Sequence, residues 1–289
     1  MSAVRERLVT FGPAQGLVGV LCEPSPGTAA PGAPAVLMAN VGVNHRVGPN
    51  RLWVELSRRL ASAGFPALRF DLSGMGDSEP RPGNDSELER GRADIADAMD
   101  VLQSRGVATR FVLIALCSGV DSAHVVARDD SRVVAAAFID GYAHRTTGWY
   151  LRQNTKRYLE PRRWQLLFQR AVQRIRHGAP RPKPPPIYTR QYPDVATLER
   201  DYGLMVDRHL GLLFVFTGGM EPQYNYAGQF FEMFQRDFRP HVQVEFLRRA
   251  DHVFFNSFER ERLLKRLVGW ITDTAGAAPL RLAANGQDE

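Results

Sequence analysis

The chain has 289 residues, of which 44% are hydrophobic and 24% charged. That composition is typical of a globular protein, and the length suits one large α/β domain, alone or with an insertion. No apolar run approaches the roughly 18 residues that span a membrane, and the first residues lack the apolar core of a signal peptide. Only Cys22 and Cys117 are present, so no disulfide framework is indicated and we expect a reducing, cytoplasmic location.

The net charge of +6 is concentrated in one segment. Residues 145–200 contain thirteen Lys and Arg against three Asp and Glu, so this segment carries +10 and the rest of the chain −4. The basic character therefore describes one surface rather than the whole molecule. Because the basic and aromatic residues there follow a helical pattern, we do not expect nucleic-acid binding.

The first half of the chain alternates apolar runs with amphipathic stretches. The expected elements are strands over 7–11, 17–23 and 35–40, a helix over 51–63, a strand over 66–71, a helix over 86–105, a strand over 111–116, a helix over 120–128 and a strand over 133–140. Strands that alternate with helices predict a mostly parallel sheet covered by helices on both faces.

The turn after the strand 111–116 predicts a nucleophile. A sharp strand-to-helix turn needs small residues two positions before and after the nucleophile, because the two backbones approach closely there. With Cys117 at the centre these positions hold Ala115 and Gly119, whereas Ser118 would place Leu116 and Val120 there. The register favours Cys117 over Ser118. A buried cysteine at the end of a core strand is the competing interpretation.

After Gly141 the alternation breaks. We expect a helical cap over residues 142–209, with an amphipathic helix over 161–177 that carries Trp164 and Phe168 on its apolar face. Regular order returns with a strand over 211–217, a helix over 223–234, a strand over 242–247 and a helix over 258–274. The predicted core is therefore 1–141 with 210–275, and 276–289 forms a tail.

The expected base and acid follow the last strands. His252 lies just after the strand 242–247, which places it at the carboxyl edge of the sheet, where ligands bind in open α/β folds. Glu221 follows the strand 211–217, and Gly218 and Gly219 permit a tight turn that aims it at the site. Cys117, Glu221 and His252 then occur in the chain order of nucleophile, acid and base. Asp140, at the end of the strand 133–140, is the competing acid.

Two backbone N–H groups are needed to stabilise an oxyanion. Ser118, the residue after the nucleophile, is expected to supply one, and Gly42 or Val43 the other. Arg46 and His45 are placed to meet an anionic or carbonyl group of a substrate, and Trp164 and Phe168 to roof its acyl part. The glycine-rich loop 71–78 fits neither phosphate-binding spacing and is interpreted as a structural loop at the rim of the site.

Together these motifs resemble the α/β-hydrolase superfamily over nearly the whole chain. The segments 41–49, 68–78 and 116–119 resemble the exosortase-system-associated hydrolases, in which the elbow also carries cysteine, usually followed by aspartate and glycine. Here Ser118 replaces that aspartate, and Val41-Gly42-Val43 replaces the usual Gly-Gly-Pro. The resemblance implies an α/β-hydrolase fold with a helical cap insertion.

The expected function is that of a cysteine-dependent acyl hydrolase or acyltransferase acting on a thioester or activated ester, without metal or other cofactor. Its substrate would be a small acyl compound, free or attached to coenzyme A or a carrier protein. For a phosphopantetheine-bearing donor, Arg162, Arg163 and Arg170 are candidate phosphate contacts. The alternatives for this segment are a solvated basic face or attraction to an anionic membrane. A non-catalytic scaffold that binds a ligand or partner is the alternative for the whole chain.

Overall fold

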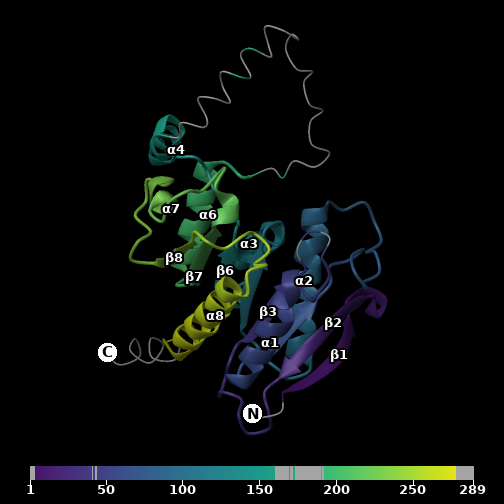
Figure 1. The fold of residues 1–289 in the computed structure, drawn as a ribbon. Coiled ribbons are helices and arrows are strands. Elements are labelled where there is room, and N and C mark those ends of the chain that lie inside the picture. Colours follow the sequence, from purple (N-terminus) through teal and green to yellow (C-terminus); the bar gives the residue numbers. More distant parts are fainter. Residues whose placement is uncertain are drawn as a thin grey trace, which may run out of the picture.

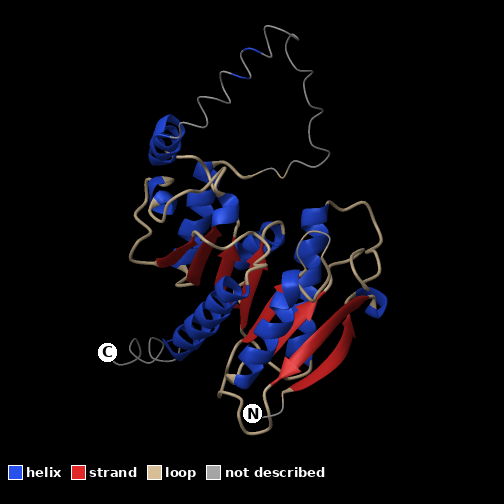
Figure 2. Cartoon of the chain, viewed as in Figure 1, coloured by secondary structure: helices blue, strands red, loops and turns tan. Residues whose placement is uncertain are grey.

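The computed structural model describes residues 4–40, 42, 44–159, 169, 172, 190 and 192–277. One eight-stranded sheet runs through the molecule in the order β1-β2-β4-β3-β5-β6-β7-β8 (Figures 1 and 2). The strands are β1 (Arg5–Phe11), β2 (Leu17–Glu23), β3 (Ala35–Ala39), β4 (Ala67–Phe70), β5 (Phe111–Leu116), β6 (Val133–Ile139), β7 (Gly211–Thr217) and β8 (Val242–Leu247). β1 pairs antiparallel with β2 and β2 with β4, and the remaining neighbours pair parallel.

Helices connect the parallel strands. They are α1 (Leu52–Ser62), α2 (Glu87–Ser104), α3 (Gly119–Asp129), α4 (Thr147–Leu159), α6 (Val195–Asp207), α7 (Gln229–Glu232) and α8 (Ser257–Ala277). Short 3-10 turns are formed by Pro13–Gln15, Pro49–Arg51 and Gly218–Met220. All eight expected strands are present, each within two residues of its predicted ends.

The core has two layers because both faces of the sheet are apolar. β5 and β6 read as nearly continuous runs of buried apolar residues, which is typical of parallel strands covered on both sides. On one face, α1 and α8 lie side by side and bury Trp53 and Trp270 against the strands (Figure 1). On the other face, α2, α3 and α6 cover the sheet.

The inserted segment is tied to the core at its end. In α6, Leu198, Tyr202 and Met205 are buried in the same cluster as Phe214 of β7, and α6 packs against α3. Residues that we expected to form the end of a cap therefore pack into the core. The expected helix over 161–177 lies outside the described residues.

The region after β7 also differs from expectation. The helix expected over 223–234 is reduced to α7, and the residues before it form turns and irregular structure. The buried side chain of Gln229 stabilises this segment, because it accepts a hydrogen bond from the Asn225 N–H and donates one to the Gln223 carbonyl. Within the part of the chain that the structure describes, no helix is long and apolar enough to cross a membrane.

Candidate active site

Cys117 lies in the turn between β5 and α3 with a positive φ of 54°. A non-glycine residue rarely adopts this backbone conformation, which is found at strained functional turns. The turn is held by hydrogen bonds from the Cys117 N–H to the Ile139 carbonyl (2.9 Å) and from the Val120 N–H to the Cys117 carbonyl (3.1 Å). A Cβ at Gly119 would lie 3.3 Å from the Asn40 carbonyl oxygen, so the chains approach closely at that position. Cys117, rather than Ser118, therefore occupies the centre of the expected elbow.

His252 is held over the elbow by its loop. The Asp251 carboxylate accepts hydrogen bonds from the N–H groups of Val253 and Phe255, which fixes the turn that follows β8. On one side, the His252 imidazole interacts with the Cys117 side chain. On its other side, Nδ1 lies 2.7 Å from Oδ2 of Asp140.

Asp140 follows β6 directly and is completely buried. Its carboxylate accepts hydrogen bonds from the Thr217 N–H (2.7 Å) and the Thr217 hydroxyl (2.6 Å) as well as from His252. A carboxylate that is buried among three donors has a fixed orientation, so it can hold His252 in one tautomer.

The acid expected from the sequence is thereby corrected. Nδ1 of His252 is hydrogen-bonded to the Asp140 carboxylate. Glu221, in contrast, is exposed, and its main-chain carbonyl accepts a hydrogen bond from the Trp149 indole N–H. Gly218 and Gly219 have another purpose than aiming Glu221. A Cβ on Gly218 would lie 2.1 Å from the Arg248 carbonyl oxygen, and one on Gly219 would lie 2.6 Å from the His252 nitrogen. The two glycines make room for the loop that carries His252.

The electrostatics favour a thiolate–imidazolium pair. Burial raises the pKa of Cys117, but its hydrogen bond to His252 and the positive charges of His252 and Arg190 outweigh burial, so the pKa lies below its ordinary value. The hydrogen bonds of His252 to Asp140 and Cys117 raise the pKa of His252 to about 10. The other cysteine behaves in the opposite way, because burial raises the pKa of Cys22 to about 11.

The expected oxyanion donors lie next to each other. The Ser118 N–H interacts with the Cys117 sulfur. Gly42, with φ +51°, donates its N–H to the Ser118 hydroxyl at 3.1 Å. The loop after β3 thus reaches the elbow at Gly42. Val43, the other candidate, lies outside the described residues.

Arg46 is engaged by the protein itself. Its guanidinium forms ion pairs with Asp71 and, at 2.6 Å, with Asp77, and its N–H donates to Asp71 at 2.5 Å. Asp71 is completely buried, and a Cβ on Gly76 would lie 2.4 Å from its carboxylate. Arg46 therefore neutralises a buried carboxylate and is not directed at a substrate, which corrects its expected role. The glycine-rich loop wraps Asp71, in agreement with a structural role, and His45 is exposed.

The roof expected from the cap helix is not described. Trp164 and Phe168, together with Arg162, Arg163 and Arg170, lie outside the described residues. The nearest described part of the insertion brings two other residues to the site, Arg190 and Tyr192, both of which interact electrostatically with Cys117. The sequence offered no signal for them, because they are more than 70 residues from Cys117 and follow no motif.

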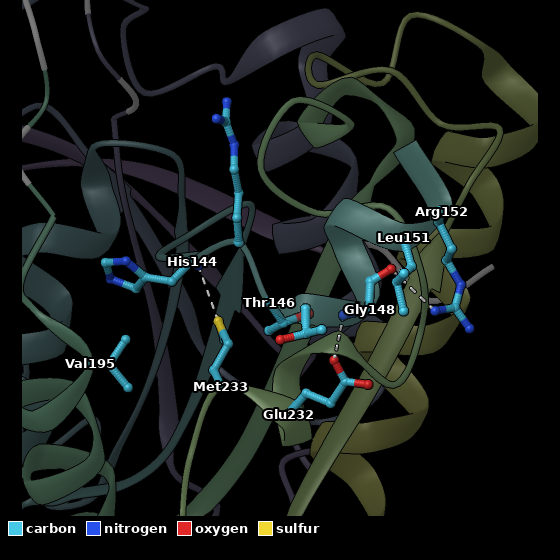
Figure 3. A pocket seen from close by; sticks show the side chains of 10 residues that line it. His144, Thr146, Gly148, Leu151, Arg152, Val195, Glu232 and Met233 are labelled. Carbon is cyan, nitrogen blue, oxygen red and sulfur yellow. Dashed lines mark hydrogen bonds between the residues drawn. The ribbon is translucent and has the colours of Figure 1, made fainter. Parts of the chain in front are cut away.

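A pocket of about 560 Å³ lies at the foot of α4 (Figure 3). His144 forms one wall, and its ring centre lies 6.2 Å from that of Tyr192. The Glu232 carboxylate accepts a hydrogen bond from the Gly148 N–H. The pocket residues are His144, Arg145, Thr146, Thr147, Gly148, Leu151, Arg152, Val195, Glu232 and Met233. Cys117, His252 and Asp140 are not among them. Across the described ranges, no His, Cys, Asp and Glu side chains gather in a group that could hold a metal ion.

No protein-family model matches the sequence, and no curated protein is significantly similar to it. Solved structures do resemble it. A hypothetical protein of Pseudomonas aeruginosa is 17% identical, with 95% of each chain covered and a TM-score of 0.55. An esterase of Pyrococcus furiosus is 14% identical, with 94% of this chain and 90% of that chain covered and a TM-score of 0.54. A dienelactone hydrolase of Anabaena variabilis is 13% identical, with 93% and 98% covered and a TM-score of 0.55. At this identity the likeness shows the fold alone, which is the α/β-hydrolase fold.

Proposed function

We propose that the protein is a cysteine-dependent acyl hydrolase or acyltransferase that acts on a thioester or activated ester through an acyl-enzyme. The observation that carries the proposal is the line of three interacting side chains, in which His252 is hydrogen-bonded to Asp140 on one side and interacts with Cys117 on the other. A nucleophile, a base and an orienting carboxylate in contact are the general requirement for covalent acyl transfer.

In the first half of the reaction, the Cys117 thiolate attacks the carbonyl carbon of the substrate. The carbonyl π electrons move to oxygen. The Ser118 N–H then turns from the Cys117 sulfur, and the Gly42 N–H from the Ser118 hydroxyl, to stabilise the resulting oxyanion. When the tetrahedral intermediate collapses, the bond to the leaving group breaks and the His252 imidazolium gives its proton to the departing thiol or alcohol. The product is a thioester between the acyl group and Cys117.

In the second half, neutral His252 removes a proton from water or another acceptor, which attacks the acyl-enzyme. The bond to Cys117 breaks, and the sulfur leaves as a thiolate beside the reprotonated imidazole. Asp140 remains ionised and keeps Nδ1 of His252 protonated throughout.

A thioester is the preferred substrate class because the attacking and leaving groups are then both thiols of similar basicity. An amide would have to expel a much more basic amine. The pocket at the foot of α4 supports an anionic substituent remote from the carbonyl, because Arg145 and Arg152 outnumber Glu232 among the charged residues of its wall. Such a substituent fits a donor attached to coenzyme A or to a carrier protein.

The experiment is a comparison of three matched donors that carry the same acyl group as a thioester, an oxoester and an amide. Rates of thiol, alcohol and amine release are measured with the purified protein, with and without added nucleophiles. We expect the thioester to react fastest and the amide not to react. An acceptor other than water that accelerates product formation would identify an acyltransferase. No turnover of any ester or thioester in a broad acyl panel would contradict the proposal.

A further inference from the structure

Arg190 belongs to the segment inserted between β6 and β7, yet it lies beside the helix that follows the elbow. Its side chain is 11% exposed. Nε donates to both oxygens of Asp121 (3.0 and 3.1 Å), and Nη2 donates to one of them at 2.5 Å. Asp121 lies in the first turn of α3, four residues after Cys117. The two-pronged ion pair therefore fixes a guanidinium near the nucleophile.

Two aromatic rings complete the clamp. The Arg190 guanidinium carbon lies 5.0 Å from the ring centre of Tyr142 and 5.0 Å from that of Tyr192. The Tyr142 hydroxyl also hydrogen-bonds Asp121, and Nη1 of Arg190 lies 3.5 Å from the Gly141 carbonyl oxygen. Stacking on aromatic rings and a fixed donor fork leave the guanidinium few alternative positions.

Arg190 is held near Cys117 because its ion-pair partner, Asp121, lies in the first turn of the helix that follows the elbow. Four groups interact with Cys117. They are the His252 imidazole, the Ser118 N–H, the Arg190 guanidinium and the Tyr192 ring. Tyr192 carries no charge near pH 7, because a phenol ionises only near pH 10 and burial raises its pKa further. Arg190 is therefore the one permanent positive charge among these four groups, and unlike His252 it keeps its proton through the reaction.

We infer that Arg190 is a positioning residue whose clamped charge favours the ionised form of Cys117. The inference rests on the proposed role of Cys117 as the nucleophile and adds a second source of thiolate stabilisation to His252. Its effect is largest when His252 has given its proton to the leaving group. When the acyl-enzyme is later cleaved, Cys117 departs as a thiolate. Arg190 then still attracts the negative charge that develops on its sulfur.

The test is the ionisation of Cys117 in the absence of substrate, followed by thiolate ultraviolet absorbance against pH. Each variant is measured against the same variant with Cys117→Ala, so that tyrosines and Cys22 cancel. Arg190→Met is expected to raise the pKa of Cys117 by about one unit, a tenfold loss of thiolate below the midpoint. Arg190→Lys, which retains a charge, is expected to recover most of the shift. Arg132→Met is the matched control, because Arg132 is also paired with aspartates but lies at the opposite end of β6.

Loss of Arg190 leaves Asp121 without its ion-pair partner and could disturb folding, so the double variant Arg190→Met/Asp121→Asn is measured in parallel. It is expected to show a smaller upward shift than Arg190→Met alone. An unchanged pKa of Cys117 in the folded single or double variant would overturn the inference. The same holds if the pKa of Cys117 is as high in Arg190→Lys as in Arg190→Met. Because the titration needs no substrate, its result is independent of acyl transfer. If the acyl-enzyme forms but the Arg190 substitutions leave the pKa of Cys117 unchanged, the role of Arg190 is refuted and the role of Cys117 is not.

Discussion

Oδ2 of Asp140 and Nδ1 of His252 lie 2.7 Å apart although 112 residues separate them in the chain. Asp140 follows β6, which lies beside β5, the strand that leads into Cys117. His252 comes from the loop after β8, at the edge of the sheet. The loop must cross β7 to make this contact, and Gly218 and Gly219 lie beneath it. The geometry assigns the orienting carboxylate to Asp140.

Replacing Asp140 by Asn is expected to lower kcat about 10³-fold or more, because an amide can present the wrong hydrogen-bonding group to Nδ1 and select the wrong tautomer. Glu221→Gln is the matched control at the other candidate acid and is expected to keep kcat within about threefold of the wild type. Steady-state hydrolysis of an acyl thioester by the two variants decides between them. Equal losses, or a larger loss for Glu221→Gln, would restore Glu221 as the acid.

The rate of iodoacetamide alkylation should report the thiolate–imidazolium pair. Since the pKa of Cys117 is lowered and that of His252 is raised to about 10, alkylation of Cys117 should reach half its maximum below the free-cysteine value of about 8.5. In His252→Gln the burial of Cys117 acts without its counterion, so the midpoint should move upward past that value. Peptide mapping separates Cys117 from Cys22, which is buried and should react slowly at all these pH values. Identical profiles for wild type and variant would show that the two side chains are not coupled.

Gly219→Ala should reduce activity through His252. The added methyl group would lie 2.6 Å from the His252 nitrogen and 3.0 Å from its Cβ, so the base loop must move. A displacement of about 1 Å at a catalytic group costs on the order of 100-fold in rate, and kcat should fall by that order. Gly269→Ala adds the same methyl group in α8, where nothing lies within 4 Å, and serves as the control. Unaltered kcat in a folded Gly219→Ala protein would mean that the loop tolerates the shift.

Arg46→Met should lower stability more than substrate affinity. The substitution leaves the completely buried Asp71 without its counterion, which is expected to cost about 3 kcal/mol of unfolding free energy. Chemical denaturation measures this loss, and Arg46→Met/Asp71→Asn should recover part of it. If Arg46 instead contacted substrate, the single variant would unfold like the wild type and show a raised KM.

The sequence was sufficient where local rules decide the structure. The apolar runs located all eight strands, and the small residues Ala115 and Gly119 located the elbow at Cys117. It favoured Glu221 over Asp140, and local rules could not reveal the error, because both residues follow parallel strands at the same edge. Which carboxylate meets His252 depends on how far the His252 loop returns across the sheet. The Asn50 side chain fixes part of that loop, because it donates a hydrogen bond to the Val253 carbonyl.

The charged residues show the same limit. The motif placed Arg46 near the site, but the burial of Asp71, which decides where the arginine points, depends on packing between β4 and the glycine-rich loop. Arg190 was not singled out from thirteen basic residues in its segment, because only the tertiary structure brings it to Asp121. Residue type and spacing thus located the turn at Cys117 and the loop of His252, whereas ion-pair partners required the fold.

The most direct test of the account is the identity of the residue that carries the acyl group. The protein is mixed with an acyl thioester, quenched in acid within one turnover, and examined by intact mass and peptide mapping. We expect one acyl adduct on Cys117, no adduct in Cys117→Ala, and an adduct with substantial turnover in Ser118→Ala, whose hydroxyl only accepts the Gly42 N–H. An acyl group on Ser118, or full activity in Cys117→Ala, would contradict a cysteine nucleophile.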